Sequence, residues 1–249
     1  MGHRADPGGV EAYLADPPGD RPVEGGLVLI HEIWGLVDHI TDVADRFAAE
    51  GFRVVAPDLL GPVGIGPHLG VELQEILFSD DERVRSEGQP RLRAALAPTR
   101  APGFSGEAIA SLRSCVDALA AMPDVDGRIG VVGFCFGGTY SFALAAADPR
   151  VRVAVPFYGA PPEATDVAAI RAPVLGFYGR KDERLVAALP AVVSAMADAG
   201  VHFEAQVYEG VGHAFFNDTN RHTYDAATAA DAWHRTLAFL RTALSAPPA

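Results

Sequence analysis

A run of small and apolar residues in the middle of the chain limits the folds that this sequence can adopt. Residues 129–134 (IGVVGF) are expected to form a short buried strand, and the alanine-rich segment 139–147 a helix. Between them lies Gly-x-Cys-x-Gly-Gly, with Cys135 at its centre. This pattern is typical of a nucleophile elbow, a sharp strand-to-helix turn whose glycines make room for a strained backbone. The turn also places the sulfur at a helix N-terminus, which favours a thiolate.

Other glycine-rich turns fit this segment less well. A phosphate-binding P-loop needs Lys followed by Ser or Thr after its second glycine. Here Gly137 is followed by Gly138 and Thr139, with no Lys. The dinucleotide-binding pattern G-x-G-x-x-G does not occur in this unit. Cys135 could instead be a buried core thiol, a common location for cysteine. The turn alone therefore leaves a catalytic and a structural role open.

The segments on both sides of this turn alternate between expected strands and expected helices. Strands are expected at residues 27–30, 52–56, 129–134, 151–157, 174–178 and 203–208, and helices at 38–50, 106–121, 184–199 and 222–244. This alternation predicts an α/β fold, with a mostly parallel central sheet and helices on both faces. A further edge strand is possible at Val10–Leu14. Sites in such sheets lie at the carboxyl ends of the strands.

One long segment interrupts the alternation. Residues 59–105 contain several Gly and Pro residues and a charged, partly amphipathic middle from Val71 to Leu96. The total length of 249 residues suits one α/β domain. We therefore expect residues 1–249 to form a single domain, in which residues 59–105 are a lid over the site or a surface insertion.

The composition limits the binding partners and the cellular location that we expect for this protein. The net charge of −12 argues against nucleic acid and anionic membranes as partners. Two cysteines make a disulfide framework unexpected, and Cys115, inside an expected helix, is interpreted as a small core residue. No signal-peptide pattern opens the sequence and no run of 18 apolar residues occurs, so we expect a cytoplasmic protein. We expect a monomer or a weak homodimer.

A thiol nucleophile needs a base, and the base needs a group that orients it. Asp182 and His213 follow Cys135 in that order, and each lies in a loop directly after an expected strand. His213 could take the proton of Cys135 while Asp182 fixes the ring and stabilises the imidazolium. Glu183 is the alternative acid. The other histidines are interpreted as structural or as lying on the last helix.

Acyl transfer also needs two N–H donors for the oxyanion. The N–H of Phe136 follows the nucleophile, and the N–H of Ile33 lies in the loop after the strand at 27–30. Glu32 stands beside this expected oxyanion hole, where its alternative role is a salt bridge to an arginine. No metal site is predicted, because the zinc motif H-E-x-x-H would need a second His where Gly35 stands.

Four parts of the sequence together resemble the dienelactone hydrolase (carboxymethylenebutenolidase) family of the α/β-hydrolase superfamily. They are EIWG at 32–35, GFCFGG at 133–138, Asp182, and GHAF at 212–215. The similarity extends from Leu27 to the last expected helix. It implies an α/β-hydrolase fold and no cofactor.

The resemblance also implies a mechanism. Cys135, His213 and Asp182 would form a triad that opens an enol-lactone or ester through an acyl-thioester. Glu32 would contact the Cys135 thiol and help to generate the thiolate when substrate arrives. The expected partner is thus a small-molecule lactone or ester.

The departures from the family pattern concern the substrate. The family's best-known members hold a substrate carboxylate with an Arg before the nucleophile, a Ser directly after the catalytic His and an Arg shortly beyond it, and they use a Tyr before the nucleophile. Here Ala214 follows His213, the nearest downstream Arg is Arg221, and no Tyr lies between Glu32 and Cys135. The predicted substrate contacts are Trp34, Arg93 and Phe215. The aromatic residues Trp34, Phe136, Phe215 and Phe216 indicate an apolar acyl or lactone pocket.

The sequence thus predicts a cysteine-dependent hydrolase of small lactones or esters. Two alternatives stay open: a general carboxylesterase or thioesterase without lactone preference, and a non-catalytic module that senses redox state through Cys135. The second alternative would need a resolving cysteine, and Cys115 is the only other one in the sequence.

Overall fold

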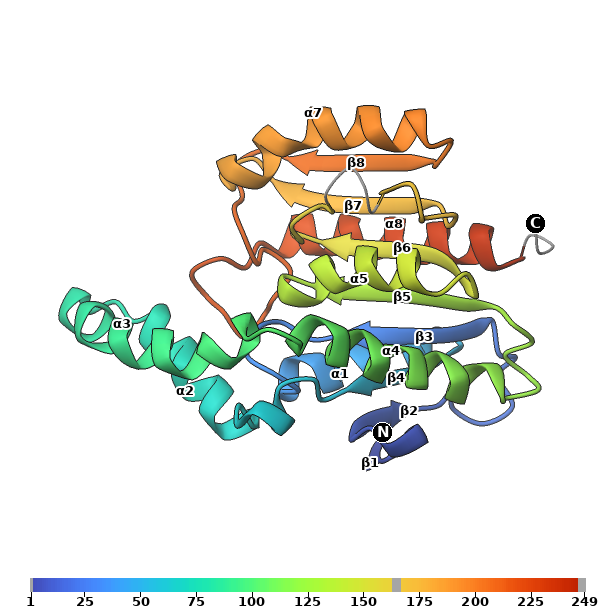
Figure 1. The fold of residues 1–249 in the computed structure, drawn as a ribbon, viewed down its shortest axis with the longest axis horizontal. Coiled ribbons are helices and arrows are strands. Elements are labelled where there is room, and N and C mark those ends of the chain that lie inside the picture. The colour runs from blue at the N-terminus through green and yellow to red at the C-terminus, as the bar shows by residue number, and fades with distance from the viewer. Residues whose placement is uncertain (1, 163–166, 246–249) are drawn as a thin grey trace.

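The computed structural model, which describes residues 2–162 and 167–245, contains an eight-stranded sheet (Figure 1). Its strands are β1 (His3–Ala5), β2 (Ala12–Ala15), β3 (Gly25–Ile30), β4 (Phe52–Pro57), β5 (Ile129–Phe134), β6 (Val151–Phe157), β7 (Val174–Gly179) and β8 (Phe203–Tyr208). They lie in the order β1-β2-β4-β3-β5-β6-β7-β8. Strands β3 to β8 are parallel, and β2 pairs antiparallel with both β1 and β4. The predicted, mostly parallel sheet is confirmed.

The central strands are apolar because both faces of the sheet are covered. Every residue of β3, β5 and β7 is buried, as expected for strands between two helical layers. The helices that cover the sheet are α1 (Asp38–Ala49), α4 (Phe104–Ala120), α5 (Phe136–Ala147), α7 (Glu183–Asp198) and α8 (Ala226–Ser245). Helices α4 and α5 pack on one face and α1 and α8 on the other (Figure 1). Helix α7 lies beside β7 and β8.

The N-terminal strand differs from its prediction. The expected edge strand at Val10–Leu14 is β2, but β1 pairs with its outer side, so that β2 is not at the edge. The three residues of β1 are largely exposed and lack an apolar pattern, which is why the sequence did not indicate a strand there. Tyr13 in β2 donates a hydrogen bond to Asp45 of α1, which fixes this hairpin to the body of the protein.

The segment 59–105 contains two helices where the sequence indicated one charged stretch. They are α2 (Pro67–Leu77) and α3 (Glu82–Leu96), with short 3-10 turns at Gly61–Val63 and Ala97–Arg100. The two helices form a hairpin that projects beyond the carboxyl edge of the sheet (Figure 1). Arg91 of α3 binds Glu72 of α2 through both carboxylate oxygens.

The last helix starts later than predicted. It begins at Ala226 because the Asp225 carboxylate accepts a hydrogen bond from the N–H of Thr228, which caps the helix. His222, expected on this helix, therefore lies in the loop before it. No helix within residues 2–162 and 167–245 has the length and apolar character needed to span a bilayer.

Candidate active site

Cys135 stands between β5 and α5 in a conformation that L-residues rarely adopt. Its φ is 55° and its ψ is −111°. Two backbone hydrogen bonds hold the turn: the N–H of Cys135 donates to the carbonyl of Phe157 at 3.0 Å, and the N–H of Gly137 donates to the carbonyl of His31 at 3.1 Å. These bonds tie the elbow to the ends of the neighbouring strands β6 and β3, and so keep it in its strained shape.

The glycines of the elbow are required by space. A Cβ atom on Gly133 would lie 2.1 Å from the carbonyl oxygen of Gly137, and one on Gly137 would lie 2.2 Å from that of Ile30. A Cβ on Gly138 would lie 2.5 Å from the carbonyl oxygen of Phe157. Each neighbour is backbone, so it cannot move aside as a flexible side chain would. The elbow predicted from the sequence is therefore built as expected.

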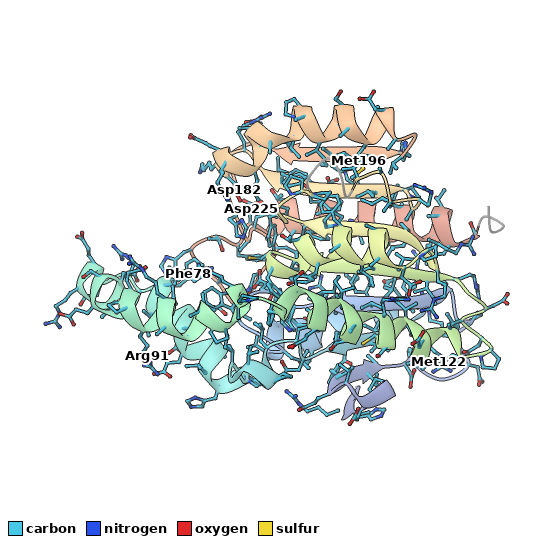
Figure 2. The ribbon with its side chains drawn as sticks, in the orientation of Figure 1. Phe78, Arg91, Met122, Asp182, Met196 and Asp225 are labelled. Carbon is cyan, nitrogen blue, oxygen red and sulfur yellow. The ribbon has the colours of Figure 1, made fainter. Side chains whose placement is uncertain are left out.

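His213 and Asp182 meet at the carboxyl ends of β7 and β8. Nδ1 of His213 lies 2.5 Å from Oδ2 of Asp182, so that its N–H donates to the carboxylate. Figure 2 shows Asp182 beyond the end of β7, at the edge of the sheet from which the α2–α3 hairpin projects. With Nδ1 occupied by Asp182, Nε2 of His213 is the ring atom left to exchange a proton with Cys135.

The surroundings of His213 favour the imidazolium. Burial disfavours the charged ring, but the hydrogen bonds with Asp182 and Cys135 and the negative charges of both groups outweigh burial and raise the pKa of His213 to about 10. Ring centroids of Tyr158 and His213 lie 4.9 Å apart, so Tyr158 supports one side of the imidazole.

Glu32 is almost fully buried and has two hydrogen-bond donors. The hydroxyl of Tyr158 donates to its Oε1 at 3.2 Å, and the amide of Asn217 donates to its Oε2 at 2.5 Å. Within the described part of the chain, no hydrogen bond joins Glu32 to Cys135, and no arginine forms a salt bridge with it. The carboxylate is thus stabilised by neutral donors rather than by a charged partner.

Tyr158 and Asn217 are the two residues of this cluster that the sequence analysis missed. Burial, together with the nearby Glu32 and Cys135 side chains, raises the pKa of Tyr158 well above its usual value, so the hydroxyl remains a donor. A signal for Tyr158 was present, because it directly follows the strand β6, just as Asp182 and His213 follow theirs. Asn217 carried no signal that sets it apart from a surface asparagine.

The two expected oxyanion donors come from different segments, the start of α5 and the loop after β3. Phe136 is the first residue of α5, where backbone N–H groups have no partner within the helix. Ile33 follows the end of β3 and Glu32. In the described residues, neither N–H donates to a protein acceptor.

Comparison with known proteins identifies the family. A model of the dienelactone hydrolase family matches residues 10–244. The chain belongs to the dienelactone hydrolase family.

Individual relatives cover nearly the whole chain. A Saccharolobus solfataricus protein named "Putative carboxymethylenebutenolidase" is 31% identical over 251 residues, which span 93% of this chain and 93% of that protein. An Escherichia coli K12 protein of the same name is 30% identical and covers 92% of this chain and 81% of its own length. The structure titled "Putative Dienelactone Hydrolase" from Klebsiella pneumoniae matches with a TM-score of 0.79 at 26% identity, over 96% of this chain and 98% of that one.

Family membership defines the general activity. This member of the dienelactone hydrolase family has the α/β-hydrolase fold and is a hydrolase that acts on ester bonds of a small-molecule substrate. No three His, Cys, Asp or Glu side chains converge as metal ligands within the ranges that the structure describes.

The predicted substrate contacts occupy different environments. Trp34 is 6% exposed and packs edge-on against Phe78 of the α2–α3 hairpin, with ring centroids 6.2 Å apart. Arg93 is exposed on α3. Phe215 is fully buried among core rings, including Phe157 and Tyr158, so it cannot touch a substrate in this structure.

The assignment of Phe215 to the pocket is therefore corrected, and the same holds for Phe216, which packs against Phe134 in the core. Both rings follow Ala214, whose φ of 60° lies in the left-handed region, and both are buried. No pattern in the sequence indicated this turn.

Arg221, the nearest downstream arginine, is already paired. Its guanidinium binds Asp80, which lies between α2 and α3. This pair borders a cavity of about 650 Å³ between the hairpin and residues 219–222, which is also lined by Phe78 and His222. Cys135, Asp182 and His213 do not line this cavity. Arg221 therefore does not present a free cation to Cys135 or His213.

Proposed function

We propose that this protein hydrolyses small, uncharged esters or lactones through an acyl-thioester on Cys135. The observation that carries the proposal is the elbow. Cys135 has positive φ at the N-terminus of α5, and His213, oriented by Asp182 at 2.5 Å, has a pKa raised to about 10 by both partners. A strained backbone and a shifted histidine pKa are both common where a nucleophile is activated.

The first half of the reaction acylates the enzyme. The Cys135 thiolate attacks the substrate carbonyl, and the negative charge that develops on oxygen is stabilised by the N–H groups of Ile33 and Phe136. When the tetrahedral intermediate collapses, the C–O bond breaks and the leaving oxygen takes a proton from the His213 imidazolium. For a lactone, the leaving alcohol or enol stays attached to the acyl group.

The second half restores the thiolate. A water molecule gives its proton to Nε2 of His213 as its oxygen attacks the thioester carbonyl. The new tetrahedral intermediate occupies the same two N–H donors and expels the Cys135 thiolate, leaving a carboxylic acid. Asp182 keeps the ring of His213 in the required tautomer and stabilises its charge in both halves.

The role of Glu32 follows from its position. To help generate the thiolate, its carboxylate would have to exchange the donor from Tyr158 or Asn217 for the sulfur of Cys135. Replacement of Glu32 by Gln should then lower the acylation rate while the protein stays folded. Unchanged acylation kinetics would restrict Glu32 to anchoring the loop of Asn217.

The pairing of Arg221, the nearest arginine downstream of His213, supports uncharged substrates. Arg221 is paired with Asp80 and Arg91 with Glu72, whereas recognition of a carboxylate is strongest when an unpaired arginine binds it through two hydrogen bonds. We expect turnover of p-nitrophenyl acetate and of neutral lactones to exceed that of cis-dienelactone, which carries a carboxylate. A preference for cis-dienelactone would contradict this substrate class.

A general esterase or thioesterase is the alternative, and a panel of esters, thioesters and lactones distinguishes it. The redox-sensing alternative receives no support from the second cysteine. Cys115 is fully buried in α4, and burial raises the pKa of its thiol to about 12. A thiol in this environment is a poor resolving partner for Cys135.

A further inference from the structure

We propose that His31 is a positioning residue that orients the Ile33 N–H donor of the oxyanion hole. This inference rests on the proposed acyl transfer through Ile33 and Phe136. His31 is the first residue after β3, is fully buried and takes no part in the proton transfers described above.

The tautomer of His31 follows from its two hydrogen bonds. Nε2 lies 3.1 Å from the backbone nitrogen of Leu59, which can only donate, so Nε2 is the acceptor. Nδ1 lies 2.6 Å from the carbonyl oxygen of Glu32, which can only accept, so Nδ1 carries the proton. Burial also lowers the pKa of His31, which keeps the ring neutral. Both ring nitrogens are therefore used.

The bond to the Glu32 carbonyl determines where the N–H of Ile33 points. The two groups belong to one planar trans peptide, in which the C=O and the N–H point in opposite directions. The N–H of Gly35 donates to the same carbonyl at 3.2 Å, so this oxygen has two donors. A rotation of this peptide would break both hydrogen bonds. His31 thereby aims the N–H of Ile33 away from its own ring.

The same residue contacts the other half of the hole. The ring of Phe136 is stacked on that of His31, with centroids 5.8 Å apart and an interplanar angle of 5°. The backbone carbonyl of His31 accepts the N–H of Gly137 at 3.1 Å. Phe136 and Gly137 begin α5. His31 therefore contacts both the peptide that carries the N–H of Ile33 and the turn that carries the N–H of Phe136.

Two substitutions test the roles of the two ring nitrogens of His31 separately. The amide of Asn reaches the position of Nδ1, so His31→Asn can still donate to the Glu32 carbonyl but leaves the N–H of Leu59 without an acceptor. The amide of Gln reaches the position of Nε2, so His31→Gln keeps the acceptor for Leu59 and loses the donor to Glu32. Each variant is therefore the matched control for the other.

Acylation is measured by stopped-flow release of p-nitrophenol from p-nitrophenyl acetate, and the reactivity of Cys135 by alkylation with iodoacetamide, which forms no oxyanion. We expect His31→Gln to acylate roughly ten- to a hundredfold more slowly, somewhat less than the loss of a whole oxyanion donor. His31→Asn should stay within about threefold of wild type, and alkylation within about threefold in both variants. The Kd of p-nitrophenyl acetate should change little.

Acylation of His31→Gln at the wild-type rate would overturn the role of His31. So would equal loss in both variants, or slower alkylation that parallels slower acylation, because these results indicate a general structural effect. The hydrolase function is judged separately on the wild-type protein. A wild type that forms no acyl-enzyme would refute the proposed function, whereas a normal wild type with a normal His31→Gln would refute only the role of His31.

Discussion

Glu32 is a buried carboxylate whose hydrogen-bond donors are neutral, and this makes each donor valuable. If either is removed, an oxygen of an almost fully buried carboxyl group is left without a hydrogen-bond partner. Tyr158 and Asn217 come from different segments, after β6 and after β8, so Glu32 joins both segments to the end of β3. The cluster is thus a structural link as well as part of the candidate active site.

Asn217→Ala should therefore destabilise the protein by about 1.5–3 kcal/mol, the usual contribution of a hydrogen bond to a charged group. Urea unfolding measures this difference. In a Glu32→Gln background the same substitution should cost less than about 1 kcal/mol, because no charge is left unpaired. Equal costs in the two backgrounds would show that Asn217 does not act through the Glu32 carboxylate.

The raised pKa of His213 makes the free energy of unfolding larger at low pH than at high pH. Its pKa is about 10 in the folded protein and about 6.5 in the unfolded chain, so its protonation stabilises the folded state fully below about pH 6.5. This contribution is lost as the pH rises through about 10. Asp182→Asn removes a principal cause of the raised pKa.

The difference in Tm between wild type and Asp182→Asn should accordingly be larger at pH 6 than at pH 10.5. Glu183→Gln is the matched control, since it removes the neighbouring carboxylate, which is exposed. The control should show no such trend and should retain activity. A pH trend in Glu183→Gln, with none in Asp182→Asn, would exchange the roles of the two acids.

At the scale of the elements, the elbow shows how close packing of backbone dictates sequence. Strand β3 and helix α5 approach so closely that a side chain at Gly137 would collide with the carbonyl of Ile30. We expect Gly137→Ala to destabilise the protein by more than about 3 kcal/mol or to prevent folding. Gly106→Ala in α4, where nothing lies within 4 Å of the added Cβ, should instead be neutral or stabilising by up to about 1 kcal/mol.

Thermal and urea unfolding of both variants measures these effects. A fully stable Gly137→Ala would mean that α5 can move away from β3 without loss, and would contradict the tight elbow described above.

Strands were easier to predict than the segments between them. Strands β6 and β8 have the bounds that the sequence indicated, since β6 is a mostly apolar run, β8 alternates apolar and polar residues, and a turn closes each strand. The α2–α3 hairpin was less visible because α3 buries only Leu92 and carries Pro90 inside it, so neither periodicity nor composition indicated its extent. The start of α8 was predicted too early, at residue 222, because several polar residues before Asp225 could also have capped the helix.

At the scale of the whole molecule, the candidate site is a set of loops brought together by a parallel sheet. The order of strands places the ends of β3, β5, β6, β7 and β8 side by side, so residues from Glu32 to Asn217 reach one edge. Sequence reasoning could predict Cys135, Asp182 and His213 because their order and their positions after strands are defined along the chain.

The supporting residues could not be predicted in the same way. Tyr158 and Asn217 contact Glu32, which lies 126 and 185 residues away from them in the sequence. His31, at the end of β3, contacts the backbone of Leu59, which follows β4. Such contacts depend on the register of the sheet and on the local twist of loops, such as the positive φ of Tyr158 and Ala214. Neither is encoded in a local pattern.

The central claim, a cysteine nucleophile, is tested most directly by intact-protein mass spectrometry of wild type and Cys135→Ala during turnover of p-nitrophenyl acetate. We predict an acetyl adduct of about 42 Da on the wild-type protein that decays as product forms, located on Cys135 by peptide mapping, with no adduct and no turnover in Cys135→Ala. Turnover by Cys135→Ala at the wild-type rate, or an adduct on another residue, would contradict the account.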